Sequence, residues 1–284
     1  MTCPVRPMDQ SLPPGLYIVA TPIGNLADLS PRAAATLRHA DLVLAEDTRV
    51  SGKLLKHIGA TTPMRSYHDH TSDAERAGFV ARLAGEAVAL ISDAGTPLIS
   101  DPGYKLVRAA RDAGHAVRTV PGPSAAVAAL SLAGLPTDRF LFLGFLSAKA
   151  NARAAAIAEV ARVRATLVLY ESGPRLCETL AALAGGLGDR DAAVARELTK
   201  LHEECVTGSL AELAARYADS PPTGEIVVMV GPPPEAEEAS DSDLDAALDE
   251  ALQRLSPSRA AAEVAEKLGI KRKRAYARAL ERAP

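Results

Sequence analysis

The sequence predicts an α/β protein with two α/β domains on mostly parallel or mixed sheets, a ligand cleft between them, and a small C-terminal helical module. Short apolar runs alternate with helical patterns over most of the 284 residues, which is typical of strands joined by crossover helices. Apolar residues make up 48% of the chain, enough to fill the cores of two domains. A charge-rich segment follows residue 233 and carries the helical module.

The first α/β domain is predicted over residues 15–123. Its apolar runs stop abruptly at small or polar residues, as strands of a buried parallel sheet do. Ser30 followed by Pro31 marks a helix start, because serine caps free amides and proline fits the first turn. Gly114 closes a later helix. The predicted strands are Leu16–Ala20, Leu42–Ala45, Val88–Ile91 and Val117–Val120, and the predicted helices are Pro31–Ala40, Asp73–Gly85 and Tyr104–Gly114.

The second α/β domain is predicted over residues 124–233. Ser124 caps a helix that ends near Gly134. Pairing of Glu203–Gly208 with its neighbours would make the second sheet mixed. The other strands are predicted at Phe140–Gly144, Thr166–Tyr170, Ala192–Arg196 and Ile226–Val230, with a helix over Arg175–Leu187.

The two ends of the chain differ in composition from the domains. Residues 1–14 are polar and rich in proline, and we expect them to be disordered. Residues 234–250 carry only acidic charges and are predicted to be a linker. Residues 251–284 are mostly basic, and a turn at Gly269 separates two helical patterns, a spacing similar to a helix-turn-helix. The alternative is a capping helical hairpin with a solvated charged face.

Composition excludes several classes of protein. The three cysteines, Cys3, Cys177 and Cys205, are scattered and lack CxxC spacing, which argues against a disulfide framework and a zinc site and for a reducing compartment. No apolar stretch reaches 18 residues, and the N-terminus does not resemble a signal sequence. We therefore expect a cytoplasmic protein that does not enter a membrane.

The most informative stretch is Ala89–Gly103, ALISDAGTPLISDPG. An apolar strand ends here in a turn of small residues, which let backbone groups approach a ligand closely. Asp93 adds a fixed acceptor, and the stretch contains no lysine or arginine, so it suits a neutral or cationic small molecule better than a phosphate. The alternative role for Asp93 is an N-cap or Asx turn. The nucleotide loops GxGxxG and GxxxxGK[ST] are absent from the chain.

Together with this stretch, six further motifs occur in a specific order. The chain resembles the tetrapyrrole-methylase superfamily of S-adenosylmethionine-dependent methyltransferases. Within it, the chain is similar to the family that methylates the ribose 2′-hydroxyl of a cytidine in 16S ribosomal RNA. The motifs are TPIGNLADLSPRA (Thr21–Ala33), EDTR (Glu46–Arg49), PGPSAAVAAL (Pro121–Leu130), YESGPR (Tyr170–Arg175), ARELTKLHEE (Ala195–Glu204) and GEIVVMVG (Gly224–Gly231).

The resemblance implies S-adenosylmethionine as the cofactor, the small ribosomal subunit as the partner, and a homodimer. It places the cofactor in the cleft between the two α/β domains. The helix start after Pro121 would favour a carboxylate such as the one on the methionine part of the cofactor. The residues expected to bind the cofactor are Pro22, Gly24, Asn25, Asp93, Ala94, Gly95, Leu98, Ile99, Ser124 and Ala125.

Methyl transfer to a ribose hydroxyl requires in-line positioning and removal of the hydroxyl proton. Acidic and basic side chains near predicted strand ends are the candidates, although each one on its own is more often part of a structural ion pair. We select Glu171, Lys200 and Asp47 as catalytic candidates: Glu171 follows an apolar strand, and Lys200 could lower the pKa of the hydroxyl. The full set is Glu46, Asp47, Arg49, Asp101, Glu171, Arg196, Glu197 and Lys200.

Basic and aromatic side chains outside the cleft are expected to contact RNA. Tyr67-His68-Asp69-His70 lacks a third ligand group for a metal, so we expect no metal site there, and its rings could stack on bases. The basic second helix of the C-terminal module could bind phosphates. The predicted RNA-binding residues are Arg49, Tyr67, His68, Arg196, Lys271, Arg272, Lys273 and Arg274.

Two other functions remain open at this point. The first is a methyltransferase of the same superfamily that acts on a small molecule such as a tetrapyrrole, which the basic C-terminal module argues against. The second is a non-catalytic RNA-binding assembly factor, which the intact Asp93–Gly95 and Pro121–Ser124 motifs argue against.

Overall fold

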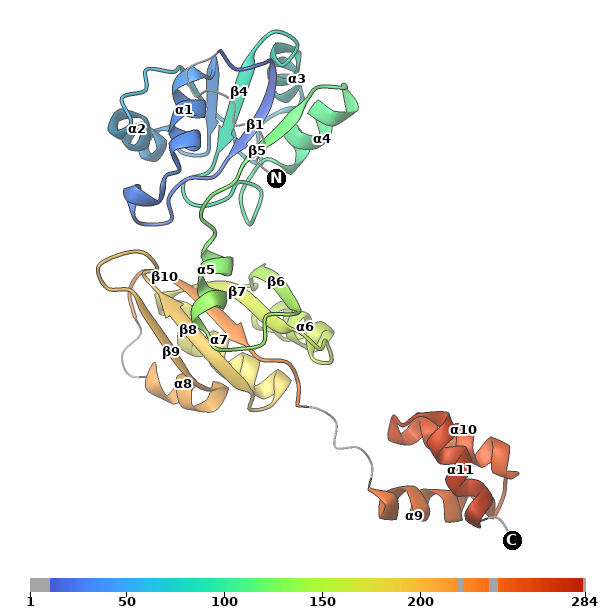
Figure 1. The fold of residues 1–284 in the computed structure, drawn as a ribbon. Helices are drawn as coiled ribbons and strands as arrows, with labels where there is room; N and C mark the ends of the chain where they lie inside the picture. The colour runs from blue at the N-terminus through green and yellow to red at the C-terminus, as the bar shows by residue number, and fades with distance from the viewer. Residues whose placement is uncertain (1–10, 219–221, 235–239, 283–284) are drawn as a thin grey trace, which may run out of the picture. The chain divides into compact units, whose positions relative to one another are not determined.

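The computed structural model describes residues 11–218, 222–234 and 240–282. The chain divides into two compact units, residues 1–233 and residues 234–284. The first unit contains two five-stranded sheets with helices on their faces (Figure 1). This arrangement confirms the predicted α/β class. None of the described helices is long and apolar enough to cross a membrane.

All strand pairs of the first sheet are parallel, and their order is β3-β2-β4-β1-β5. Every residue of β2 and β4 is buried, because α1 and α2 cover one face of the sheet and α3 and α4 the other. The strands are β1 (Gly15–Val19), β2 (Leu42–Ala45), β3 (Met64–Ser66), β4 (Ala87–Ile91) and β5 (Val117–Val120). The helices are α1 (Pro31–His39), α2 (Thr48–His57), α3 (Asp73–Arg82) and α4 (Tyr104–Asp112), with a 3₁₀ turn η1 (Leu26–Asp28).

The second sheet is mixed, with the order β6-β7-β10-β8-β9. Only β6 and β7 pair in parallel. Because β10 runs antiparallel to β7, its first residue, Glu225, lies beside Ser172 at the end of β7. The strands are β6 (Phe140–Phe145), β7 (Thr166–Ser172), β8 (Asp191–Arg196), β9 (Glu204–Ser209) and β10 (Glu225–Val230). Helices α6 (Ala150–Val160), α7 (Gly173–Leu187) and α8 (Leu210–Arg216) pack on one face, and α5 (Ala125–Leu132) on the other.

The N-terminal segment differs in part from the prediction of disorder over residues 1–14. Residues 1–10 lie outside the described residues. The Pro13 carbonyl accepts a hydrogen bond from the Tyr17 hydroxyl at 2.8 Å, and the Pro14 carbonyl accepts one from Arg118 at 3.0 Å. Residues 11–14 are therefore held against the first sheet, and disorder was the wrong prediction for them.

Within its described residues the second unit forms three helices, α9 (Asp241–Leu252), α10 (Pro257–Leu268) and α11 (Arg272–Arg282). The turn between α10 and α11 lies at Gly269, as the spacing indicated. The acidic segment predicted as a linker over residues 234–250 is instead helical from Asp241, and residues 235–239 lie outside the described residues. The reason is that Leu244 and Leu248 recur at helical spacing and are buried against α10 and α11.

Candidate active site

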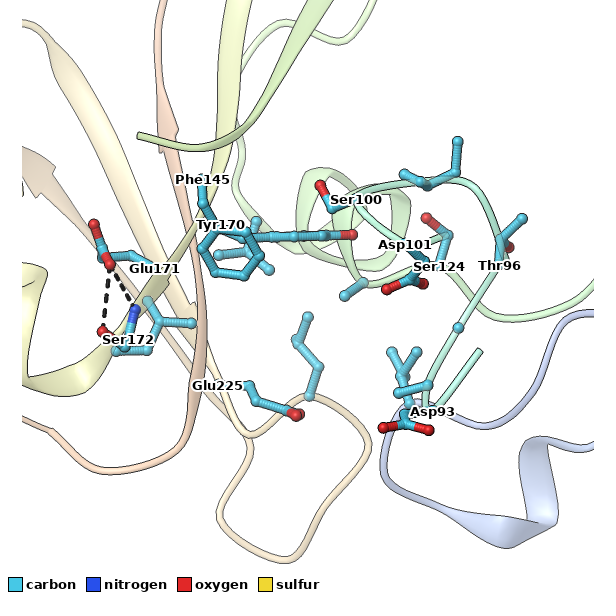
Figure 2. A pocket seen from close by; sticks show the side chains of 18 of the residues that line it. Asp93, Thr96, Ser100, Asp101, Ser124, Phe145, Tyr170, Glu171, Ser172 and Glu225 are labelled. Carbon is cyan, nitrogen blue, oxygen red and sulfur yellow. Dashed lines mark hydrogen bonds between the residues drawn. The ribbon is translucent and has the colours of Figure 1, made fainter. Parts of the chain in front are cut away.

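A cavity of about 470 Å³ lies in the first unit and is lined by residues that follow strands of both sheets. The loop between β4 and α4 forms one wall, and the end of β7 together with the start of β10 forms the opposite wall (Figure 2). The first sheet is parallel, so the carboxyl end of β4 opens into this cavity, as is usual for ligand sites in α/β proteins.

The wall from the β4–α4 loop is fixed by hydrogen bonds to two other loops. Thr21 and Gly95 exchange backbone hydrogen bonds, at 2.8 Å from the Thr21 amide and 3.1 Å from the Gly95 amide. The Thr96 hydroxyl donates to the Pro123 carbonyl at 2.9 Å. The small residues of the stretch therefore place backbone groups at the cavity and tie the three loops together.

The structure brings most of the predicted cofactor residues to the cavity, but not those of the Thr21–Asn25 loop. From that loop Ile23, which the sequence did not single out, lines the cavity and packs beneath α5. Gly24 faces Lys200 instead, where a Cβ atom would lie 2.6 Å from Cγ. Asn25 caps η1 by accepting from the Ala27 amide at 3.0 Å. The predicted residues that do line the cavity are Asp93, Ala94, Gly95, Ile99, Ser124 and Ala125.

Two further predicted positions, Pro22 and Leu98, are not among the lining residues. Leu98 has a left-handed backbone, with φ of 74°, and its side chain packs into the core under the first sheet. The Leu98 side chain therefore anchors the loop, and its contact with the cofactor stays a prediction.

Carboxylates surround the cavity, and none of the lining residues is a lysine or arginine. Burial raises the pKa of Glu46, and the nearby charges of Asp101 and Asp93 raise it further. Burial also raises the pKa of Asp101, and the charge of Asp93 adds to this effect. Glu171, from the end of β7, and Glu225, from the start of β10, are the other acidic residues among those that line the cavity. Such a set favours a cationic ligand over an anionic one.

Tyr170 crosses the cavity and was missed as a site residue. Its hydroxyl points toward Asp101 and Ser124 in Figure 2. Burial raises its pKa. The hydroxyl thus lies at the N-terminus of α5. This is the helix start that the sequence analysis expected to favour the carboxylate of the cofactor. The one feature of the sequence that could have identified Tyr170 as a site residue is its position at the end of an apolar strand.

The carboxylate of Glu171, one of the predicted catalytic candidates, is held by several neighbouring groups. It accepts from the Thr179 hydroxyl at 2.7 Å and from the Ser172 amide at 2.8 Å, and lies 3.4 Å from Arg175. Glu171 is among the residues that line the cavity, but its side chain is only 1% exposed, and in Figure 2 its carboxylate points away from the cavity centre. Glu171 therefore organises the start of α7.

Lys200 lies beside the cavity rather than on its lining. Its Nζ is 3.0 Å from Glu197 and 3.3 Å from Glu225. Burial lowers the pKa of Lys200, but the hydrogen bond to Glu197 and the charge of Glu225 outweigh burial and leave the pKa raised. A lysine in two ion pairs is a structural cation that joins two loops, so the catalytic role is not supported by its geometry.

Asp47 is the N-cap of α2 and accepts from the Arg49 amide at 2.8 Å. The Arg49 side chain forms a further ion pair with this carboxylate at 2.7 Å. The hydrogen bonds from Arg49 lower the pKa of Asp47 to about 2. A carboxylate so stabilised is a weak base, so this environment does not favour the catalytic role predicted for Asp47.

The predicted RNA contacts of the first unit have mixed outcomes. Tyr67 is 2% exposed and packs edge-on to Phe79, so its ring cannot stack on a base and that prediction was wrong. His68 is exposed beside it. Arg49 is exposed, although it pairs with Asp47, and Arg196 pairs with Glu204 at 2.6 Å.

In the second unit, acidic side chains of α9 bind the basic side chains of α11. Arg278 forms a two-pronged contact with Asp245, at 2.6 and 2.8 Å. Arg274 lies 2.9 Å from Asp241, and Arg282 is paired with Asp249. Arg274, which was predicted to bind RNA, therefore also has a structural role in joining α11 to α9. Exposed side chains at the start of α11 are Lys271, Arg272 and Lys273.

Across the part of the chain that the structure describes, no three His, Cys, Asp or Glu side chains are grouped so that they could hold a metal ion.

Comparison with known proteins gives two family matches. Residues 15–214 match the family of tetrapyrrole (corrin/porphyrin) methylases. Residues 238–283 match the RsmI C-terminal HTH domain.

Curated relatives are similar along nearly the whole chain. A protein from Erythrobacter litoralis named ribosomal RNA small subunit methyltransferase I is 56% identical over 272 residues, covering 96% of each chain. A protein of the same name from Mesorhizobium japonicum is 48% identical over 281 residues, covering 98% of this chain and 94% of the relative.

Solved structures share the fold at low identity. Diphthine synthase has a TM-score of 0.60 at 16% identity, covering 76% of this chain and 89% of its own. Uroporphyrin-III C-methyltransferase from Thermus thermophilus, complexed with S-adenyl homocysteine, has a TM-score of 0.53 at 21% identity, covering 76% and 97%.

The tetrapyrrole-methylase match covers the first sheet and strands β6–β9 of the second sheet, and the second match covers the C-terminal helices. The chain therefore belongs to the tetrapyrrole (corrin/porphyrin) methylase family and, within it, to the ribosomal RNA small subunit methyltransferase I family.

Proposed function

We propose that the protein transfers a methyl group from S-adenosylmethionine to the ribose 2′-hydroxyl of a cytidine in 16S ribosomal RNA. The observation that carries the proposal is the acidic cavity, lined without lysine or arginine, in a chain whose relatives of 43–56% identity are named ribosomal RNA small subunit methyltransferase I. The names of the relatives specify ribosomal RNA, which favours this function over methylation of a small molecule. The cavity favours an enzyme over a non-catalytic assembly factor.

The residues present fit S-adenosylmethionine. The cavity volume lies within the range of roughly 300–1,000 Å³ that small-molecule sites occupy, and its carboxylates suit the sulfonium and ammonium charges of this cofactor. When bound, S-adenosylmethionine supplies a methyl group that is already activated by the sulfonium. We assign its binding to Asp93, Ala94, Gly95, Ser124 and Ala125, with Ile23 completing the wall.

Asp101 is the proposed general base. It lines the cavity beside Asp93, and burial raises its pKa above the usual range for aspartate. A carboxylate with a raised pKa accepts a proton from a hydroxyl more readily than one stabilised as Asp47 is.

The C-terminal helices are proposed to bind the phosphates of the RNA. Lys271, Arg272 and Lys273 are exposed at the start of α11, and lysine and arginine there would displace counterions from the RNA backbone. In the first unit, His68, Arg49 and Arg196 are the proposed additional contacts.

Several features of the assembly belong to the same proposal. We infer a homodimer in the cytoplasm that needs no metal ion, with residues 15–123 and 124–233 as its two α/β domains. Sedimentation at micromolar concentration would test the dimer, and activity in the presence of a chelator would test the independence from metal.

Labelled methyl transfer tests the function. Small ribosomal subunits that lack the modification are incubated with the protein and labelled S-adenosylmethionine, in parallel with a tetrapyrrole acceptor. Label in the ribosomal RNA is expected. Label in the tetrapyrrole alone would support the small-molecule enzyme, and cofactor binding without any transfer would support the assembly factor.

A further inference from the structure

Phe145, the last residue of β6, has a position that the preceding argument leaves unexplained. It lines the cavity, yet the residue is 59% exposed. Its ring packs edge-on against Tyr170, with 5.6 Å between the ring centroids. Tyr170 therefore contacts one side of the Phe145 ring, while the rest of the ring is exposed at the mouth of the cavity.

A β-bulge directs Phe145 into the cavity. Leu141 and Leu143 pack against the core under α6 and α7, and strict alternation along the strand would place Phe145 on that same face. The register between β6 and β7 shifts between Phe142 and Gly144, so that Phe145 pairs with Tyr170. The extra residue changes the face to which the side chain points, which is a recognised use of bulges near active sites.

Gly144 permits this bulge. Its φ is 62°, a left-handed conformation that glycine adopts without strain. A Cβ atom at this position would also lie 3.1 Å from the Ser100 hydroxyl oxygen of the loop across the cavity. Glycine at position 144 thus allows the Phe145 ring to turn toward the cavity. It also allows Ser100, on the opposite wall, to approach the backbone closely.

The charges around the mouth restrict which part of an RNA can approach Phe145. Glu46, Asp93, Asp101 and Glu225 surround the cavity without a lining lysine or arginine, so they repel phosphate groups. The uncharged base and ribose of a nucleotide are the parts that can enter. Single-stranded bases in protein–RNA complexes commonly stack on exposed aromatic rings.

We propose that Phe145 is the stacking platform for the base of the acceptor nucleotide, which enters the cavity splayed out from its RNA strand with its phosphates held outside. Tyr170 supports the ring from behind. The inference rests on the proposed function, because it assumes an RNA acceptor.

The test compares three variants for methyl transfer to small ribosomal subunits, for S-adenosylmethionine affinity by calorimetry, and for oligomeric state by sedimentation. Phe145→Ala removes the ring and Phe145→Trp retains a stacking surface. Phe140→Ala is the matched control, since Phe140 lies on the same strand, is 49% exposed and is outside the cavity lining.

Phe145→Ala is expected to lower kcat/KM for the subunits by about 5- to 150-fold, the range that corresponds to loss of one base–aromatic stack. Its cofactor affinity and oligomeric state should stay unchanged. Phe145→Trp and Phe140→Ala should retain wild-type kcat/KM.

Three outcomes would overturn the inference. Wild-type efficiency of Phe145→Ala would show that no stacking occurs there. A weakened cofactor affinity would assign the ring to the cofactor, and a change in oligomeric state would assign it to an interface between copies. The wild-type reaction serves as the reference: if the wild-type protein does not methylate the subunits, the proposed function itself fails, independently of Phe145.

Discussion

The backbone amide of Asp47 donates a hydrogen bond to the carboxylate of Asp93, with 3.0 Å between nitrogen and Oδ1. Asp47 follows β2 and Asp93 follows β4, and these strands are neighbours in the first sheet. The contact therefore links the Glu46–Arg49 motif to the Ala89–Gly103 stretch at the carboxyl ends of these two strands. It also fixes the Asp93 side chain, which lines the cavity.

Replacement of Asp93 by alanine is expected to weaken S-adenosylmethionine binding by about 5- to 150-fold, because it removes a charged hydrogen-bonding group. Titration calorimetry measures the change. Asp112→Ala, an exposed aspartate on α4, is the control and should bind as the wild type does. Unchanged affinity in Asp93→Ala would contradict the assignment of the cofactor to this cavity.

The pH dependence of methyl transfer should report the ionisation of Asp101. The base acts only when its carboxyl group is deprotonated, and burial raises its pKa. The rate should therefore fall as pH decreases through that raised pKa, above the range of an ordinary aspartate. Asp101→Asn should lose most of the single-turnover rate at every pH. A variant with the wild-type rate and the same acidic limb would exclude Asp101 as the base.

Glu171→Gln separates a structural role from a catalytic one. The substitution replaces one acceptor oxygen by an amide donor next to the Thr179 hydroxyl or the Ser172 amide. We expect a loss of about 1–3 kcal/mol in the free energy of unfolding, measured by denaturant titration. The single-turnover rate of the folded variant should remain close to wild type. A stable variant with a collapsed rate would restore Glu171 as the base.

The salt dependence of RNA binding tests the start of α11. The double variant Lys271→Gln, Lys273→Gln should bind small-subunit RNA more weakly, and the slope of log K against log salt should decrease by about 0.7–0.9 per lost contact. Lys105→Gln, which makes the same substitution at an exposed lysine on α4, is the control. An unaltered slope would mean that these two lysines do not meet phosphates.

Much of the fold follows from local sequence patterns. Buried runs such as Ala87–Ile91 and cap residues such as Ser30 mark their elements directly. Helix α9 (Asp241–Leu252) was not recognised because the eight acidic residues between 235 and 250 suggested a solvated linker. The compensating charges, Arg278 among them, lie some 33 residues further along the chain, and such a pairing becomes visible only after folding.

The candidate site was predictable on one wall only. The residues of the β4–α4 loop, including Asp93, stand together in one motif, whereas Glu225 enters the cavity because β10 runs antiparallel to β7. Phe145 is turned by a bulge that leaves no clear pattern in the sequence. Tyr67 was assigned to the surface because its neighbours are polar, but its ring fills the core under the first sheet.

The position of the transferred methyl group tests the central claim most directly. After reaction of unmodified small ribosomal subunits with labelled S-adenosylmethionine, the RNA is digested with nucleases that require a free 2′-hydroxyl. The account predicts label in a nuclease-resistant dinucleotide that contains 2′-O-methylcytidine. Label on a base, or in a fully digested nucleotide, would contradict it.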